Sequence, residues 1–252
     1  MRSRARAACS ALSVVVVFTV VVMSYRQNVR AYPSGGGDYE VDSAAWFGEL
    51  DYALNDHWTL TAGLRYTDET KRADIASLVF NVNNPCNVVF GTCDFDFSDE
   101  ADWQAWSGKL GFTYNMDVGL VYGNWSRSQR AGGYNLRNTA VDVVNLGPGP
   151  FDEEVVDNLE LGIKADFANG VRFNGAIFFM MIDDQQREVN LPDPISGVVQ
   201  VIKNTADTEI FGLEFDTIIP VGDSTVLTAS AGFIDPQYQE IFFDLTGDGV
   251  ID

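Results

Sequence analysis

The chain has 252 residues, with 16 Lys and Arg, 36 Asp and Glu and one His, for a formal net charge of −20. Such an acidic chain repels phosphate backbones, which excludes nucleic-acid binding, and a single His excludes any catalytic triad or metal site that needs two. The apolar content of 46% is too high for a disordered acidic chain, so the sequence predicts a folded body.

The N-terminal segment differs from the rest of the chain. It carries Arg2, Arg4 and Arg6, followed by the apolar run Ala11–Met23, which is shorter than the ~20 residues of a membrane-spanning helix. Basic residues before such a run are typical of a secretory signal. We therefore expect residues 1–31 to be a signal peptide or apolar N-terminal segment, with cleavage before Tyr32. An uncleaved anchor and a misassigned start on a truncated gene are the alternatives. Residues 32–43 are expected to be a linker.

The remaining chain, 44–252, alternates between apolar and polar residues with a period of two. The clearest segments are His57–Thr67, Val155–Phe167 and Glu209–Ile219. Side chains at positions i and i+2 lie on one face only in a β-strand, so these segments are predicted to be strands. Similar patterns predict further strands near 45–54, 102–114, 118–128, 171–183 and 225–234.

These strands are about 10–13 residues long, against about 5–6 in most globular proteins. Short connections such as Asn55-Asp56 and Ala168-Asn169-Gly170 alternate with long polar stretches. Strand length, loop asymmetry and the export signal favour an outer-membrane barrel over a soluble β-sandwich with the same alternation. We predict an all-β fold, a partial antiparallel transmembrane barrel of about eight up-and-down strands. Aromatic residues near strand ends are expected to form interfacial girdles, namely Trp46, Trp58, Trp103, Tyr114, Trp125, Phe167 and Phe233.

Six stretches, in order, resemble the C-terminal barrel region of TonB-dependent outer-membrane receptors. They are LTAGLRYTDETK, YGNWSRSQRAGGYN, VDNLELGIKADF, FNGAIFFMMIDDQQ, NTADTEIFGLEFD and ASAGFIDPQYQEI. The resemblance implies uptake of a scarce nutrient, such as an iron–siderophore or vitamin complex, across the cell outer membrane. It implies contact with outer-membrane lipid and a small nutrient ligand, no cofactor and no enzymatic activity.

The chain departs from the family in two respects. Members carry an N-terminal plug domain and a segment that contacts TonB, whereas this sequence passes almost directly from its apolar segment to the first strand. A complete family barrel has about 22 strands, whereas about eight are predicted here. We therefore expect a fragment that does not transport alone. A small closed barrel of eight strands, with a structural or adhesive role, is the alternative.

Two cysteines, Cys86 and Cys93, lie in the predicted loop NNPCNVVFGTCDFD. Outside the cytoplasm such a pair usually forms a disulfide, which is our expectation. Two free thiols are the alternative, and a metal site is disfavoured because no His accompanies the pair.

The C-terminal stretch resembles the opening of a calcium-binding loop, with Gly249 at the sixth position. The possible ligands are Asp244, Thr246, Asp248 and Asp252. The bidentate Glu of such loops would lie beyond Asp252, so a polar surface loop is favoured and no metal site is assigned. A secreted calcium-binding β-protein is the third reading of the chain.

Other polar residues have structural readings. His57 begins a strand beside a short turn and is expected to lie at the membrane interface. The acidic pair Asp183-Asp184 and the run 152–154 are read as solvated loop acidity. Arg127 and Arg130 are expected to pair with acids in the lumen, with an anionic ligand or lipid headgroup as the alternative. The sequence therefore predicts no catalytic residue and leaves the ligand-binding residues unknown.

Overall fold

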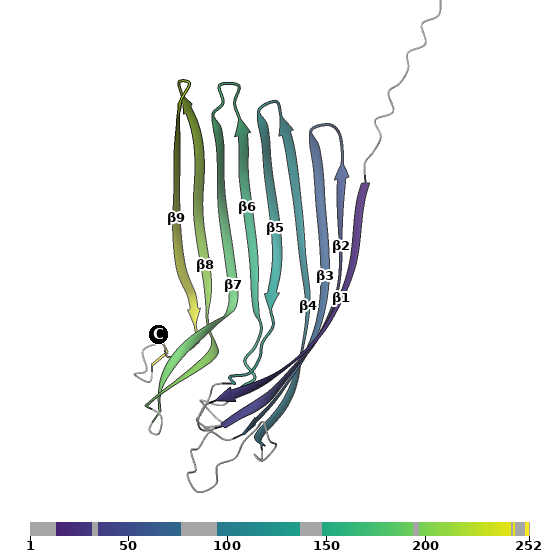
Figure 1. The fold of residues 1–252 in the computed structure, drawn as a ribbon, viewed down its shortest axis with the longest axis vertical. Helices are drawn as coiled ribbons and strands as arrows, with labels where there is room; N and C mark the ends of the chain where they lie inside the picture. The colour runs from purple at the N-terminus through teal and green to yellow at the C-terminus, as the bar shows by residue number, and fades with distance from the viewer. Residues whose placement is uncertain are drawn as a thin grey trace, which may run out of the picture.

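The computed structural model describes residues 14–31, 35–76, 95–136, 148–193, 197–242, 244 and 250–251. These residues form one antiparallel sheet of nine strands whose spatial order follows the chain (Figure 1). The prediction of an all-β, up-and-down architecture is confirmed. In the described residues no helix is long and apolar enough to cross a membrane. The strands are β1 Val14–Ala31, β2 Gly35–Ala53, β3 Trp58–Ala76, β4 Phe95–Met116, β5 Gly119–Arg130, β6 Glu154–Asp166, β7 Arg172–Asp193, β8 Gly197–Val221 and β9 Thr225–Ile241.

The structure has one strand more than the eight predicted. This additional strand is β1, which lies in the segment expected to be a signal peptide. It pairs with β2 from Val14 opposite Tyr52 to Ala31 opposite Gly35, and β2 itself begins within the expected linker. Its run of β-branched valines suits a strand as well as a signal sequence. Cleavage before Tyr32 stays a prediction.

The sheet is open, with β1 and β9 at its two edges. The alternative of a small closed barrel is therefore wrong for the described residues, since closure requires the first and last strands to pair. The architecture is a partial barrel.

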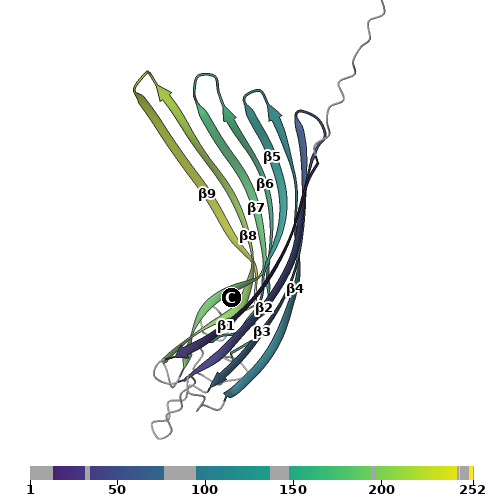
Figure 2. The ribbon, with the colours of Figure 1, turned by 45° about the vertical axis from the view of Figure 1, so that its right-hand side comes forward.

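Short turns lie at one end of the sheet (Figures 1 and 2). At the other end, residues 77–94 separate β3 from β4 and residues 131–153 separate β5 from β6, whereas β7 and β8 extend to within three residues of each other. The short turns span 54–57, 117–118, 167–171 and 222–224. In the first, the Asn55 side-chain oxygen accepts hydrogen bonds from the amides of His57 and Trp58, both 2.9 Å long. Side-chain capping of this kind explains why a turn this short reverses the chain.

The two faces of the sheet differ as the alternation predicts. One face carries exposed large apolar side chains; Leu161, Ile177 and Leu213 lie side by side on neighbouring strands. The opposite face carries polar groups such as Glu160 and Glu214. In an outer-membrane barrel the apolar face contacts lipid and the polar face lines the lumen.

Aromatic side chains mark the edges of the apolar band on the lipid face. Trp58 lies against Tyr114 near the short turns, with ring centroids 4.8 Å apart. Tyr66, eight positions further along β3, lies between Trp46 at 5.9 Å and Trp106 at 4.8 Å. Eight residues of strand span about 26 Å, or about 20 Å along the barrel axis at a tilt of about 40°, which covers most of the about 25 Å apolar band of such barrels. Beyond Tyr66 this face becomes polar, with Asp68, Thr70, Arg72 and Asp74.

The predicted girdle position of Trp103 is wrong. Trp103 pairs with Glu69 and lies on the lumen face, beyond the apolar band, with a residual exposure of 8%. Alternation places Trp103 on the lumen face, opposite to Trp106. It lies beyond the apolar band because β4 continues past the membrane before it ends.

Candidate functional site

The chain that leaves β5 turns across the lumen face at the long-loop end. We call residues 131–136 the mouth segment. It pairs with residues 148–151, which lead into β6: the Gly133 amide donates to the Phe151 carbonyl at 3.1 Å, and the Phe151 amide donates back to Gly133 at 2.9 Å. Residues 131–136 and 148–151, which we call the two stalks of the loop between β5 and β6, thus form a small, hydrogen-bonded unit.

Aromatic packing holds the mouth segment against β3 and β4. Tyr134 is 6% exposed and meets Trp103 and Phe97 edge-on, with centroids 6.3 and 6.0 Å away. Its hydroxyl donates to the Asp99 carboxylate at 3.0 Å. Burial, together with Asp99, raises the pKa of Tyr134, so this phenol keeps its proton and remains a donor. Ala73 and Ile75 complete this cluster.

Lys71 adds a polar contact to the same side. Its ammonium lies 2.9 Å from Glu69, donates to the Gly132 carbonyl and sits 5.2 Å from the Trp103 ring centroid. Gly132 is required here, because a Cβ atom would lie 2.1 Å from the Phe151 carbonyl oxygen. The backbone therefore approaches its neighbours more closely than any side chain permits.

Asn135 attaches the other side of the mouth segment to β8. Its side-chain nitrogen donates to the Ile202 carbonyl at 3.1 Å, and its side-chain oxygen accepts from the Ile202 amide at 2.6 Å. The Asn135 side chain thereby makes with Ile202 the two backbone hydrogen bonds that a neighbouring strand would otherwise make. The mouth segment consequently joins the long-loop ends of β3–β4 to β8 across the lumen face.

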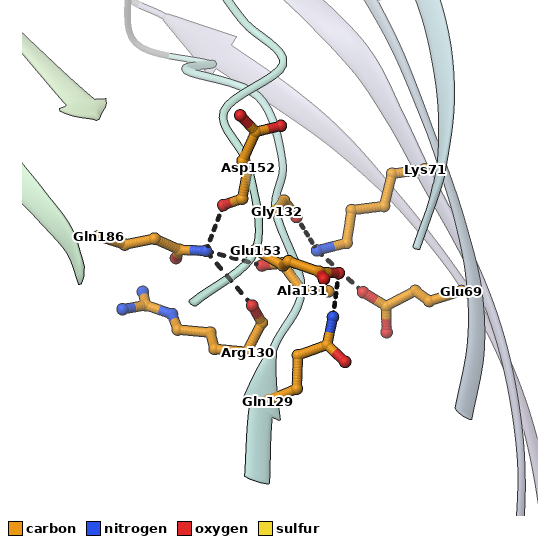
Figure 3. A network of polar contacts seen from close by, with 9 residues as sticks. All are labelled: Glu69, Lys71, Gln129, Arg130, Ala131, Gly132, Asp152, Glu153 and Gln186. Carbon is orange, nitrogen blue, oxygen red and sulfur yellow. Dashed lines mark hydrogen bonds and ion pairs between the residues drawn. The ribbon is translucent and has the colours of Figure 1, made fainter. Parts of the chain in front are cut away.

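Gln186 of β7 lies where the two stalks meet (Figure 3). Its Nε2 donates to the carbonyls of Asp152 at 2.9 Å, Ala131 at 3.2 Å and Arg130 at 3.4 Å. Its own amide donates to the Glu154 carboxylate at 2.7 Å. With 7% exposure, Gln186 is a buried polar anchor for both stalks.

Asn204 of β8 holds the returning stalk from the other side. Its Oδ1 accepts from the Asp152 amide at 2.8 Å, while its Nδ2 donates to the carbonyls of Asp184 at 2.8 Å and Asp152 at 3.1 Å. Gln186 and Asn204 together satisfy backbone groups that a loop over the lumen would otherwise leave without partners.

Acidic side chains surround this network. Asp184 adopts φ 53° at an irregularity in β7, and its amide donates to the Asp207 carboxylate at 2.9 Å. Burial, followed by the charges of Asp207, Asp152 and Asp183, raises the pKa of Asp184. The reading of this acidity as a merely solvated face is thus incomplete, since the Glu154 carboxylate accepts from the Gln186 amide and the Glu153 carboxylate accepts from the Gln129 side chain.

A polar hollow lies in the lumen face between the network and the short turns. It has a volume of about 700 Å³ and is lined by Tyr122, Lys164, Asn174, Glu214, Asp216 and Ser230. Tyr122 donates to Glu160 at 2.6 Å. The lumen wall is therefore hydrophilic below an ordered mouth, an arrangement suited to the passage of a polar solute.

Most of the predicted site residues lie outside the part of the chain that the structure describes. Cys86 and Cys93 lie outside the described residues, as do Thr246, Asp248 and Asp252 of the calcium candidate; only Asp244 is described. No group of three or more His, Cys, Asp or Glu side chains in the described residues is arranged to hold a metal ion. The disulfide stays a prediction.

His57 lies in a short turn, where its Nδ1 is 3.0 Å from the Asn115 carbonyl and its ring meets Tyr114. The expectation that Arg127 pairs with an acid in the lumen is wrong. Arg127 pairs with Asp157 at 3.3 Å on the lipid face, because β5 places it in line with Trp125.

Sequence reasoning assigned no role to Asn135, Gln186 or Asn204. All three lie within stretches that carry the family resemblance, RAGGYN, DDQQ and NTADTE. Polar residues that interrupt or end an alternating strand in such stretches were the available signal.

Residues 17–249 match the protein family described as "TonB dependent receptor-like, beta-barrel". Among solved structures, the ferric yersiniabactin uptake receptor FyuA from Yersinia pestis superposes with a TM-score of 0.69 at 19% identity, over 90% of this chain and 33% of that one. The copper transporter OprC gives 0.70 at 13% identity, over 90% and 36%. The chain spans about a third of the length of these structures, and the likeness concerns the fold. No curated protein matches the chain.

Replacing Gln186 should loosen the two stalks. Gln186→Ala removes the side-chain donor from the carbonyls of Arg130, Ala131 and Asp152, of which Asp152 keeps its bond from Asn204. Each buried group left unsatisfied costs about 1–3 kcal/mol. We expect faster hydrogen exchange at the Gly133 and Phe151 amides in the detergent-solubilised chain, measured by mass spectrometry. Gln200→Ala, at an exposed position of β8, is the control. Unchanged exchange at Gly133 in Gln186→Ala would show that Gln186 is not an anchor.

Replacing Asp184 with Asn should stabilise the chain in a pH-dependent way. A raised pKa means that ionisation of Asp184 opposes folding, so the penalty is present at neutral pH and disappears below the unfolded value of about 3.9. Asn also tolerates the positive φ. We expect Asp184→Asn to raise the unfolding temperature at pH 7, with the gain shrinking as pH falls towards 4. Asp223→Asn, in a short turn, is the control. A gain that does not vary with pH would contradict the electrostatic explanation.

Proposed function

The chain belongs to the TonB-dependent receptor family, of which it matches the β-barrel, and from this premise we propose that it takes part in the uptake of a scarce nutrient complex. Members of this family are outer-membrane transporters, so the chain is an outer-membrane component and not an enzyme. The substrate class we propose is a metal chelate such as an iron–siderophore complex, or a vitamin complex of similar size.

The observation that carries the proposal is the ordered mouth above a polar lumen wall. Gln186, Asn204 and Asn135 fix the start and end of a long loop directly over the lumen face. A receptor needs such fixed stalks, because a loop that captures a ligand from solution must present it repeatedly at the same place above the pore. A barrel with a purely structural role has no such need.

Two structures with a similar fold support the substrate class by analogy. One is an uptake receptor for ferric yersiniabactin and the other is a copper transporter. In the proposed receptor, a plug and a segment that contacts TonB complete the transport unit, and TonB supplies the energy for passage through the barrel.

The proposal is tested by uptake in the source organism. Deletion of the gene for the proposed complete receptor, plug included, should reduce uptake of one ligand in a panel of radiolabelled ferric siderophores, copper chelates and cobalamin to the background level. Restoring the gene should restore uptake, and a Gln186→Glu version should restore less at equal outer-membrane abundance, because a carboxylate would face three carbonyl oxygens. Gln200→Glu is the matched control. Uptake of every ligand at the parental rate after deletion would contradict the proposal.

A further inference from the structure

The strand β1 changes from apolar to polar at the same level of the sheet as β2. At positions paired with the lipid-facing residues of β2, β1 is apolar near the short turns: Val14, Val16, Phe18, Val20 and Val22 pair with Tyr52, Leu50, Gly48, Trp46 and Ala44. Beyond Val22 these positions become polar on both strands, with Ser24, Arg26 and Asn28 opposite Asp42, Glu40 and Asp38. On β3 the change follows Tyr66, one residue pair earlier. The apolar band therefore continues from β3 through β2 onto β1.

Beyond the band, strand pairing arranges charges of alternating sign across four strands. Arg26 of β1 pairs with Glu40 of β2, which pairs with Arg72 of β3, and Arg72 pairs with Glu100 of β4. The side chains of Arg72 and Glu100 form an ion pair. Opposite charges at directly paired positions stabilise antiparallel strands. A leader peptide has no reason to match the register of the protein that it exports, and small residues are typical before a cleavage site. Arg26 therefore fits a strand better than the end of a leader.

The backbone of β1 pairs with β2 along its whole length. All 18 residues of β1 pair in one register, from Val14 opposite Tyr52 to Ala31 opposite Gly35. In the described sheet no other strand pairs with this side of β2, and lipid offers no partner for its amides and carbonyls. The family match gives independent support, because it begins at residue 17, inside β1. Residues 14–31 thus belong with the barrel by register and by family resemblance.

We propose that residues 14–31 stay in the mature protein as a membrane-spanning strand of the barrel. Cleavage before Tyr32, which is the expectation from the sequence alone, is incompatible with this proposal. A run rich in valine suits both a secretory signal and a strand, but the two differ in what each position requires. The apolar core of a signal treats neighbouring positions alike, whereas a strand places them on opposite faces. Substitutions at two adjacent positions therefore distinguish a strand from a signal.

The first test is a matched pair of substitutions near the middle of the band, in the full chain as the source organism makes it. Val16 pairs with Leu50 of the lipid face, and Val17 pairs with Glu49, a lumen residue whose carboxylate lies 2.7 Å from Lys109. Arginine on the lipid face near the bilayer centre is strongly destabilising, whereas lumen positions accept charge. We expect Val16→Arg to lower the amount in the outer membrane about tenfold, measured by quantitative mass spectrometry. Val17→Arg, beside Glu49, should stay near the parental amount. Equal amounts of the two variants, whether reduced or unchanged, would overturn the proposal.

The second test needs no substitution. The intact mass of the protein purified from outer membranes should include residues 14–31, and trypsin should release the peptide that ends at Arg26. A mature chain that begins at Tyr32, or at any residue after Val14 within β1, would overturn the proposal. Neither test depends on nutrient uptake, so their outcome is independent of the proposed function.

Discussion

Within a membrane, a strand must satisfy its backbone amides and carbonyls on its neighbours, because lipid offers none. This constraint governs the whole sheet. In the half of the sheet nearest the short turns, the described strands pair without interruption, and the β4–β5 pairing ends at Gly108 and Arg127. The register shifts lie beyond this region on the long-loop side, at Ile75/Ala76, Ile182/Gln185 and Asp207/Thr208. An unbroken ladder keeps the alternating apolar side chains, such as Leu161, Ile177 and Leu213, on the lipid face, since a slip of one residue would exchange the two faces.

The candidate site arises where this constraint ends. Once β7 and β8 leave the membrane, water can satisfy the backbone, and the irregularity near Asp184 turns side chains away from simple alternation. Gln186 and Asn204 then point at the stalks of the loop and bond to their carbonyls. The same strands are thus regular where they contact lipid and irregular where they hold the mouth segment.

A period of two in the sequence was sufficient to predict the fold class, both faces and the short turns, because all three follow from local alternation and turn chemistry. Alternation also places Trp103 on the face opposite Trp106, and the girdle prediction for Trp103 was wrong because it used only nearness to a strand end. The valine-rich segment 14–31 suits both a signal peptide and a strand. The network at Gln186 was beyond prediction because it joins residues far apart in the chain, such as Gln186 and Ala131, and interrupted alternation does not show which residues will be partners.

One face of the sheet thus contacts lipid and the other contacts water. Cysteine accessibility along β8 tests it most directly, in a background where Cys9, Cys86 and Cys93 are replaced by Ser. In native outer membranes, Glu214→Cys and Asp216→Cys should react with a water-soluble maleimide, while Leu213→Cys and Phe215→Cys should be protected. Equal labelling rates for the two sets would contradict the claim.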